Sequence, residues 1–355
     1  MSSTPTSPRL FPAETTRGFI ARALAAAGVP EGDAQVVAEL MTEIDLRGGD
    51  GHGIFRLVQY IKRIKAGGIN VKPDIKLAKE SPGMAIVDGD NAMGHLVMRR
   101  AADVAMEKAA KCGVAWVGTR NSNHAGAAAI HAMMPLERDM IGLYVAVGNA
   151  NHLPPWGGTE MLLSTNPLAV AVPALDEPPV VLDMASTVAA YGKVKMAAQR
   201  GEQMPVGWMI DREGKPLTDP NRADDGFLLP IGGYKGYGLS LIFGLLAGTL
   251  NGAAFGKDVV DFNADDTTPT NTGQFLVAID IKAFADVEGF KRQVDGVIRA
   301  IRASPTLPGF DRVFLPGEQS HAKFQRRNVD GIPIPDVLLG NLEKLAGELG
   351  ISGLG

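Results

Sequence analysis

The spacing of apolar residues changes near residue 70, and this change constrains the fold more than any other feature of the chain. Segments 12–27, 33–47 and 54–65 each place apolar residues on one helical face, and Gly28 and Gly67 follow the first and the last of them. Beyond this point, short apolar runs alternate with segments of helical spacing. A chain that opens with helices and continues with alternating strands and helices is predicted to form an α/β fold.

The elements expected after the change follow from runs of strand-forming residues and from amphipathic spacing. Strands are expected at 76–79, 84–88, 114–119, 141–147, 168–173, 180–184 and 275–281, and helices at 96–111, 125–138, 238–255, 287–303 and 336–349. Residues 1–11, rich in Ser, Pro and Thr, are expected to form a loose tail. The length of 355 residues allows two or three domains, and the absence of repeats and linkers predicts that they pack closely.

Composition excludes several classes of protein. The content of 45% apolar and 21% charged residues is typical of a soluble globular protein, and a net charge of -4 without a basic block argues against nucleic acid. The single cysteine, Cys112, cannot form an internal disulfide, which fits a reducing cytoplasm. The uncharged run 238–255 is barely as long as the shortest membrane spans and contains Asn251, so it is interpreted as a buried helix.

One segment, Arg47–Arg56, places a histidine between two glycines and an arginine four residues later. If a helix begins near Gly53, then His52, Arg56 and Tyr60 are spaced one turn apart on one face. An arginine holds a carboxylate through two hydrogen bonds, and a histidine transfers a proton near neutral pH, so this pattern suits an anionic carbonyl substrate. The alternative is a glycine turn before an ordinary helix with an exposed His and Arg.

Two further polar segments follow strands of the expected sheet, where α/β proteins bind ligands. Asn121–Gly126 joins the strand 114–119 to a helix and places His124 at the helix N-terminus, although Asn and Ser also cap helices without binding a ligand. The loop 148–158 and the segment Ser164–Pro167 carry amides and hydroxyls that suit a ribose or a carboxamide, but the same residues form ordinary turns.

Three more segments are candidates for ligand binding. In Leu182–Thr187, Asp183 closes an apolar strand and hydroxyls open a helix, which suits a ribose, a nicotinamide or a histidine partner; a simple cap at Ser186 is the alternative. Gly232–Gly238 presents one lysine before a buried helix, an arrangement that suits an anion. Pro316–Glu318 is a turn near the end of the chain.

Two common kinds of site are absent from the sequence. No Gly-x-Gly-x-x-Gly lies between a strand and a helix, so a dinucleotide site must depend on other residues. No spacing of His, Cys, Asp and Glu resembles a metal cage, and no metal is expected. His95, His131 and His321 have no partner pattern and are interpreted as structural or surface residues.

Together these motifs resemble the malate/L-lactate dehydrogenase family, which lacks a Rossmann fold and includes sulfolactate and ureidoglycolate dehydrogenases, diketogulonate reductase and Δ1-piperideine-2-carboxylate reductase. The resemblance covers roughly residues 10–340 and is carried, in the family's order, by Asp50–Gly53 with Arg56, Asn121–His124, Pro155–Gly158, Thr165–Pro167, Asp183–Ala185 and Lys235–Gly238. It implies a mixed sheet with flanking helices in an α/β cofactor-binding region at 76–299, and a helical domain built from 1–75 together with 300–355.

The resemblance also implies a function: a cytoplasmic homodimer that uses NADH or NADPH to transfer hydride to or from a small 2-oxo/2-hydroxy acid or, alternatively, a cyclic imino acid. Its implied catalytic residues are His52 or His124 as acid/base, with Asp183 assisting. Substrate contacts are implied at Arg56, Tyr60 and Gly51. Cofactor contacts are implied at His124, Gly148, Thr165, Asp183, Met184, Ala185, Lys235, Gly236, Gly317 and Glu318.

The chain departs from the family at Gly51, where the family usually has serine. The missing hydroxyl can contact a substrate or relay a proton, so a wider pocket or an imine substrate is a hypothesis that follows from Gly51. The alternative from another class is a non-catalytic dinucleotide- or metabolite-binding protein. The retained His52, Arg56, His124 and Asp183 argue against that alternative.

Overall fold

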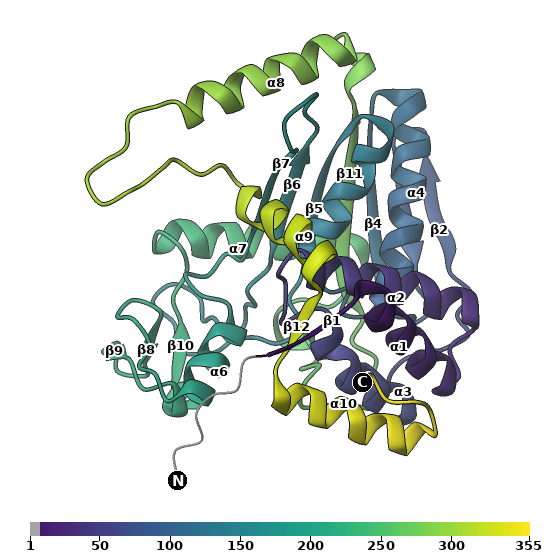
Figure 1. The fold of residues 1–355 in the computed structure, drawn as a ribbon, viewed down its shortest axis with the longest axis vertical. Helices are drawn as coiled ribbons and strands as arrows, with labels where there is room; N and C mark the ends of the chain where they lie inside the picture. The colour runs from purple at the N-terminus through teal and green to yellow at the C-terminus, as the bar shows by residue number, and fades with distance from the viewer. Residues whose placement is uncertain (1–7) are drawn as a thin grey trace.

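The computed structural model describes residues 8–355, and at its centre lies a mixed sheet of seven strands (Figure 1). In spatial order the strands are β2 (Lys76–Ser81), β3 (Met84–Asp88), β4 (Val114–Ser122), β11 (Thr272–Asp280), β5 (Met140–Ala146), β6 (Leu168–Val172) and β7 (Val180–Met184). Strands β3 and β4 are parallel, and the other neighbouring pairs of this sheet are antiparallel. The mixed α/β architecture predicted from the sequence is confirmed.

Helices cover both faces of the sheet because successive side chains of a strand point to opposite faces. In the central strand β11, Leu276 packs in one apolar cluster with α4 (Gly94–Cys112) and α5 (Ala128–Met133). The preceding residue, Phe275, packs on the other face with α7 (Tyr234–Ala247). The sheet is therefore the middle layer of a sandwich of helices.

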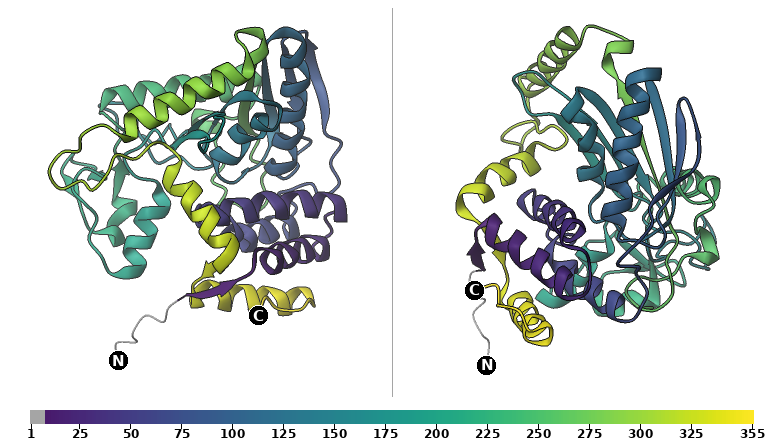
Figure 2. Two further views of the ribbon diagram at one scale, coloured as in Figure 1. Left: turned by 45° about the horizontal axis from the view of Figure 1, so that its top comes forward. Right: turned by 90° about the vertical axis from the view of Figure 1, so that its right-hand side faces the viewer.

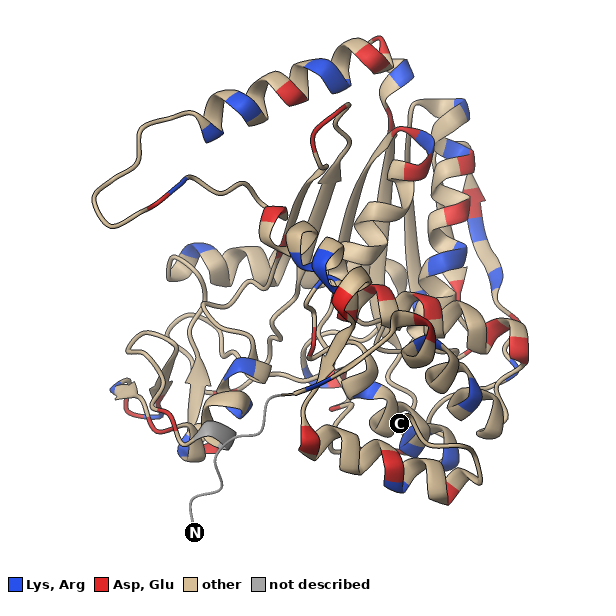
Figure 3. Ribbon diagram, viewed as in Figure 1, with Lys and Arg blue, Asp and Glu red and all other residues tan. Residues whose placement is uncertain are grey.

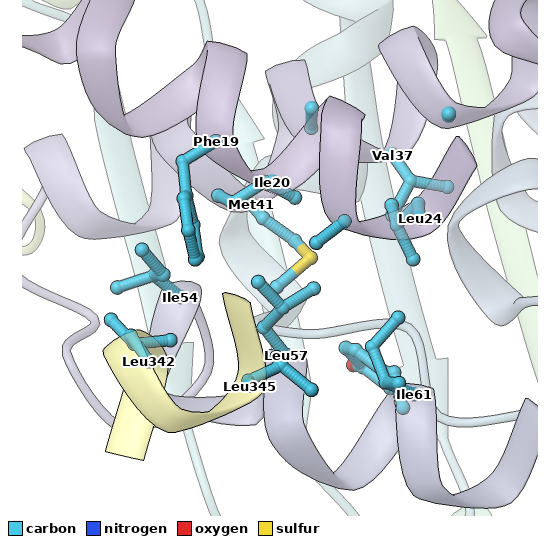
Figure 4. Packing of buried hydrophobic residues seen from close by; sticks show 14 of the residues in the cluster. Phe19, Ile20, Leu24, Val37, Met41, Ile54, Leu57, Ile61, Leu342 and Leu345 are labelled. Carbon is cyan, nitrogen blue, oxygen red and sulfur yellow. The ribbon is translucent and has the colours of Figure 1, made fainter. Parts of the chain in front are cut away.

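A second group of helices lies beside the sheet and comes from both ends of the described chain (Figure 2). It contains α1 (Ala13–Ala26), α2 (Glu31–Leu46), α3 (Leu57–Lys65), α9 (Glu318–Asp330) and α10 (Asp336–Leu349). One apolar cluster joins these helices, with Phe19, Met41, Leu57 and Leu342 meeting at its centre (Figure 4). Strand β1 (Arg9–Phe11) pairs with β12 (Ile332–Ile334) and links the two chain ends.

The remaining elements lie at the edges of the molecule. A small sheet of β8 (Met209–Asp211), β9 (Pro216–Leu217) and β10 (Gly226–Leu228) packs with α6 (Tyr191–Arg200) around an apolar cluster of its own. The long helix α8 (Val287–Arg302) runs along the top of Figure 1. Short 3-10 helices are formed by Ile54–Arg56, Met134–Arg138, Pro220–Asp225, Thr249–Asn251, Gly256–Asp258 and Ile281–Ala283.

Three expectations from the sequence are wrong in part. The tail expected at 1–11 ends in strand β1, because Leu10 and its neighbours pair with β12; residues 1–7 lie outside the described residues. No helix opens at Ser186, because its hydroxyl donates to the carbonyl oxygen of Thr165 at 2.8 Å instead of capping, and α6 begins only at Tyr191.

The third correction concerns the run 238–255, which was expected to be a buried helix. Helix α7 covers its first part, but Leu239, Ile242 and Leu245 are 41%, 52% and 39% exposed. Only one face of α7 packs against the sheet, and Figure 3 shows that most of this helix carries no charged residue. Within the described residues, no helix is long and apolar enough to cross a membrane.

Candidate active site

The glycine-rich segment between α2 and α3 forms a tight turn over the end of α2. Asp45 holds this turn, because its Oδ2 accepts the N–H of Ile54 at 2.8 Å. A Cβ added to Gly53 would lie 2.0 Å from Asp45 Oδ1, so the close approach requires glycine. Burial raises the pKa of the Asp45 carboxyl to about 8. Asp50, in the same turn, pairs with Arg327 of α9 at 3.2 Å, which ties the turn to the C-terminal helices.

Arg56 ends the 3-10 helix that follows the turn, and two of its nitrogens are held by the protein. Its Nε donates to the carbonyl oxygen of Gly51 at 2.9 Å, and its Nη1 donates to Oδ1 of Asn263 at 2.9 Å. The other N–H groups lie on the two terminal nitrogens and form no hydrogen bond within residues 8–355. A Cβ added at Gly51 would meet no atom within 4 Å, so there is room for a side chain at this position.

The two histidines of the predicted site come together although 72 residues separate them in the sequence (124 − 52). The rings of His52 and His124 stack with centroids 5.8 Å apart, and Phe262 stacks on His124 at 5.2 Å. Tyr60, the third residue of the predicted helical face, lies 2.6 Å from His124 Nδ1 through its hydroxyl. The motifs around His52 and His124 therefore form one site. His124 precedes α5 by a short loop instead of beginning the helix, because the helix starts at Ala128.

Hydrogen bonds assign the tautomer of His124. The backbone N–H of Gly126 points at Nδ1 of His124 at 3.3 Å, and an N–H group can only donate. Nδ1 is therefore an acceptor, the Tyr60 hydroxyl donates to it as well, and the ring proton is assigned to Nε2. The ring of His52 makes no hydrogen bond with any described residue.

Burial and a nearby cation keep both histidines neutral. Desolvation, followed by the positive charge of Arg56, lowers the pKa of His52 to about 4. The same two causes, in the same order, hold the pKa of His124 well below its usual value. Burial also raises the pKa of the Tyr60 hydroxyl, which keeps it protonated and able to donate.

Two more buried histidines, His95 and His131, contact residues next to this site. His95 lies edge-on to the ring of Tyr60 at 5.5 Å and is fully buried, with neither ring nitrogen hydrogen-bonded in the described structure. His131 donates from Nε2 to the carbonyl oxygen of Ala125 at 2.8 Å. Both residues are buried, whereas His321 is only half-buried on α9.

The ends of β5 and β7 bring together several residues that the sequence assigned to a cofactor. The N–H of Gly148 donates to Oδ1 of Asn166 at 3.0 Å, and a Cβ on Gly148 would lie 3.2 Å from the Thr165 hydroxyl. The N–H of Ser186 donates to the carbonyl oxygen of Thr165 at 2.8 Å. Gly148, Thr165 and the segment that follows Met184 therefore meet at one edge of the sheet.

Asp183 connects this edge to α5, and no hydrogen bond joins its carboxylate to a described histidine. It lies on β7 opposite Ala169, and its Oδ2 accepts the N–H of Ala129 at 3.0 Å, five residues after His124. Desolvation raises the pKa of Asp183, and the hydrogen bond from Ala129 partly offsets the rise. Met184 pairs with Leu168 on β6, next to Ala185 in sequence.

The remaining predicted cofactor residues surround the same strand end. A Cβ on Gly236 would lie 2.3 Å from the carbonyl oxygen of Ile231. The backbone N–H of Ile231 donates to the carbonyl oxygen of Ser186 at 3.0 Å. The first turn of α7, which contains Lys235, is therefore tied to the end of β7. Lys235 is exposed and has no ion pair among residues 8–355. The Thr165 hydroxyl, the Asp183 carboxylate and the Lys235 ammonium can each form further hydrogen bonds. Together they could hold the hydroxyl and phosphate groups of a dinucleotide.

The last predicted residues, Gly317 and Glu318, lie on the other side of β7. The N–H of Val181 donates to the carbonyl oxygen of Pro316 at 3.1 Å, and a Cβ on Gly317 would lie 2.9 Å from Val181. The carboxylate of Glu318 accepts the N–H of Leu315 at 3.1 Å and also pairs with Arg302 and Arg312. Protein groups therefore already engage Glu318, which opens α9.

Sequence reasoning missed the segment 261–268, although it carries two residues of the site. Phe262 contacts His124 and Tyr60, and Asn263 contacts Arg56. The segment is rich in Asp, Asn and Thr and reads as an ordinary turn. No local signal distinguishes it, because its partners on α3 lie about two hundred residues earlier in the chain.

Comparisons with known proteins identify the family of the chain and its fold. A family model described as malate/L-lactate dehydrogenase matches residues 11–343. The malate dehydrogenase of Pyrococcus horikoshii is 38% identical over 352 residues, which cover 97% of this chain and 96% of that protein. The ureidoglycolate dehydrogenase (NAD(+)) of Escherichia coli O157:H7 is 35% identical over 323 residues, or 91% and 92% of the two chains. The structure of sulfolactate dehydrogenase from Methanocaldococcus jannaschii matches with a TM-score of 0.90 at 37% identity and covers 97% and 98%.

Proposed function

The chain belongs to the malate/L-lactate dehydrogenase family, and we propose that it transfers hydride between a nicotinamide cofactor and C2 of a small 2-oxo/2-hydroxy acid. The observation that carries the proposal is the stacked pair His52–His124 beside Arg56, whose free N–H groups lie on its terminal nitrogens. Family membership makes the chain an oxidoreductase and confirms the resemblance indicated by the motifs. Relatives carry NAD(+) or NADP(+) in their names, so the cofactor is NADH or NADPH.

Arg56 is proposed to bind the substrate carboxylate. Its Nε is occupied by the carbonyl oxygen of Gly51, so a carboxylate meets the terminal nitrogens Nη1 and Nη2. Such charge-assisted hydrogen bonds fix both the position and the orientation of a carboxylate. The substrate carbonyl, one bond away, would then lie near His52 and His124, both of which sense the charge of Arg56.

His52 is proposed to carry the proton, and His124 to donate a fixed hydrogen bond. His124 is held at Nδ1 by Tyr60 and Gly126, so its Nε2–H can only donate to the substrate oxygen. The ring of His52 is not held by any described residue and can alternate between protonated and neutral forms. In reduction His52 would give a proton to the oxygen at C2, and in oxidation it would remove one.

Substrate binding would itself prepare His52 for this step. In the free protein, desolvation and then the charge of Arg56 lower the pKa of His52. A carboxylate bound to Arg56 would offset the second of these causes and so raise the pKa of His52. Proton transfer is thereby coupled to occupation of the carboxylate site.

The cofactor is proposed to bind along the end of β7, where Thr165, Asp183 to Ala185 and Lys235 meet. When bound, it supplies the hydride; the protein holds and orients it. The Thr165 hydroxyl and the Asp183 carboxylate suit a ribose or a carboxamide, and Lys235 suits a phosphate. Gly148 and Gly236 keep the surrounding turns close together.

We also propose a homodimer, formed through α7. Its apolar residues Leu239, Ile242 and Leu245 are exposed, and no charged residue follows Lys235 in α7 (Figure 3). Several large apolar side chains exposed on one helix mark a protein contact. Ile242→Glu should shift the mass measured by light scattering from dimer to monomer, whereas Val337→Glu, at an exposed site on α10, should leave it unchanged. The same mass for wild type and Ile242→Glu would remove α7 from the interface.

A cytoplasmic location is proposed from the single cysteine.

The proposed reaction is tested by following NADH and NADPH at 340 nm with a panel of acceptors: pyruvate, oxaloacetate, 2-oxoglutarate, phenylpyruvate, sulfopyruvate and Δ1-piperideine-2-carboxylate. Strong turnover of one 2-oxo acid is expected, and it would identify substrate and cofactor together. Preferred turnover of the imine would replace the proposal by the reductase alternative. Cofactor binding without turnover of any compound would favour a binding protein.

Gly51 offers a test of substrate specificity that leaves the hydrogen bonds of Arg56 intact. Position 51 holds Arg56 through its backbone carbonyl, and a Cβ there meets no atom within 4 Å. Gly51→Ser therefore adds a hydroxyl without removing a contact, and it is expected to change the ranking of acids in the panel. An unchanged ranking would show that the missing hydroxyl does not set specificity.

A further inference from the structure

The loop 261–268 packs along α3 and is anchored there by side chains outside the substrate site. Gln59 donates through Nε2 to the carbonyl oxygen of Phe262 at 2.8 Å and to Asp266 at 2.9 Å. The buried guanidinium of Arg63 donates to the carbonyl oxygen of Thr268 at 2.7 Å. These anchors hold the loop in place without any contribution from Asn263.

Two consecutive residues of this loop contact the proposed hydrogen-bond donor, His124, and the proposed carboxylate-binding residue, Arg56. Phe262 is buried, stacks on the ring of His124 and lies 5.6 Å from the ring of Tyr60. Asn263 accepts a hydrogen bond from Nη1 of Arg56. One short loop therefore fixes both the histidine and the arginine.

The orientation of the Asn263 amide is determined by Asp261. Oδ1 of Asp261 accepts the backbone N–H of Asn263 at 2.8 Å and the side-chain Nδ2 at 3.3 Å. With the amide nitrogen turned toward Asp261, the amide oxygen faces Arg56. Because that oxygen is neutral, it orients the guanidinium without cancelling its charge.

We infer that Asn263 is a positioning residue that aims the terminal N–H groups of Arg56 at an anionic substrate group and preserves their full charge for it. The carbonyl oxygen of Gly51 fixes Nε, and Asn263 fixes Nη1, so the guanidinium plane is held at two points. A carboxylate in place of this amide would pair with Arg56 and compete with the substrate. The inference rests on the proposed function and assigns the selection of anionic substrates to Asn263 together with Arg56.

The experiment compares Asn263→Asp and Asn263→Ala with two matched controls. Asn328→Asp makes the same charge change on the exposed surface of α9, and Thr267→Ala removes a side-chain hydrogen bond to Asp265 within the same loop. The preferred 2-oxo acid of the wild type and its neutral methyl ester serve as substrates. The dissociation constant of oxalate, measured by calorimetry, gives a readout that does not require turnover.

Asn263→Asp is expected to raise the KM for the acid and the dissociation constant of oxalate by about tenfold or more, and Asn263→Ala by less. The kcat for the acid, the KM for the ester, the NAD(P)H affinity and the melting temperature should change little. Both controls should behave as wild type. This split between KM and kcat, confined to the anion, distinguishes positioning from a merely structural contribution.

Equal KM values for the acid in wild type and Asn263→Asp, or equal losses with acid and ester, would overturn the inference. If the wild type turns over none of the acids, the proposed function fails on its own. In that case the oxalate measurement still tests Asn263, because it reports anion binding at Arg56 alone.

Discussion

The two sides of the candidate site are built differently. On the helical side, two of the site-forming side chains are held by named partners: Arg56 by Gly51 and Asn263, and His124 by Tyr60 and Gly126, whereas the ring of His52 makes no hydrogen bond with a described residue. On the sheet side, Lys235 is exposed and has no ion pair among the described residues. There, it is mostly the backbone that is hydrogen-bonded, as between Ser186 and Thr165.

The difference shows which part of the chemistry depends on pre-organisation. Carboxylate binding and the hydrogen bond to the substrate oxygen need groups held within a fraction of an ångström, so Arg56 and His124 are held before the substrate arrives, whereas the ring of His52 stays free to change its protonation state. A dinucleotide is long and makes many contacts, so each one can be weaker and free until the cofactor binds. Substitutions on the helical side should therefore have larger effects than those on the sheet side.

The largest effect is expected at the histidines. His52→Ala should lower kcat by about 10²–10⁴-fold, because the proton carrier is lost, and His124→Ala by about 10²-fold, because one oriented donor is lost. Single-turnover rates at saturating cofactor measure both, with His321→Ala on α9 as the control. A larger loss for His124→Ala than for His52→Ala would exchange the two assignments.

Arg56→Lys tests carboxylate binding on the helical side while keeping a positive charge. Lysine cannot donate to Gly51 and Asn263 and present two parallel N–H groups to a carboxylate at the same time, so KM for the acid should rise by about 10²-fold. Steady-state kinetics with the preferred acid measure the change. Arg222→Lys, in an exposed 3-10 helix, is the matched control. A KM close to that of wild type would show that charge alone suffices.

Lys235→Ala tests the sheet side and should have a smaller effect on ligand affinity than Arg56→Lys. Removal of an exposed ammonium is expected to weaken NAD(P)H binding only a few-fold, with KM for the acid unchanged. Cofactor fluorescence titration measures the dissociation constant, and Lys257→Ala, at an exposed lysine beyond α7, serves as the control. A loss as large as that of Arg56→Lys would contradict the comparison between the two sides.

The smallest effect on turnover is expected at Asp45, the carboxyl that supports the turn before His52, where the change is one of stability. Burial raises the folded-state pKa of Asp45 to about 8 from its ordinary value of 3.8, so between these pH values the folded protein holds a proton that the unfolded chain releases. The stability contributed by protonated Asp45 is complete below about pH 4 and is lost as pH rises through about 8. Relative to wild type, Asp45→Asn should therefore become more stable as pH rises.

Urea unfolding at several pH values between 5 and 8 measures that difference, with Glu31→Gln at the exposed start of α2 as the control. The comparison uses differences between variants, because other buried groups titrate in both proteins. A difference between wild type and Asp45→Asn that does not vary with pH would show that Asp45 is charged in the folded state.

Much of the fold was readable from local patterns. The apolar stripe and Gly67 placed the helix that ends at Lys65, and the run Val114–Thr119 placed β4, because amphipathic spacing and strand propensity are local properties. The same patterns failed for α7. An apolar helix looks the same in a sequence whether a core or another protein chain covers it.

The sequence by itself determined the chemical groups of the site: a histidine between glycines, an arginine one turn later, a second histidine, and a carboxylate at a strand end. Only the tertiary structure decided how they act together. It stacked His52 on His124, placed the Tyr60 hydroxyl against Nδ1 of His124, and brought Asn263 to Arg56. The physical reason is that motifs describe neighbours along the chain, whereas orientation and pKa depend on groups that folding brings in from distant segments.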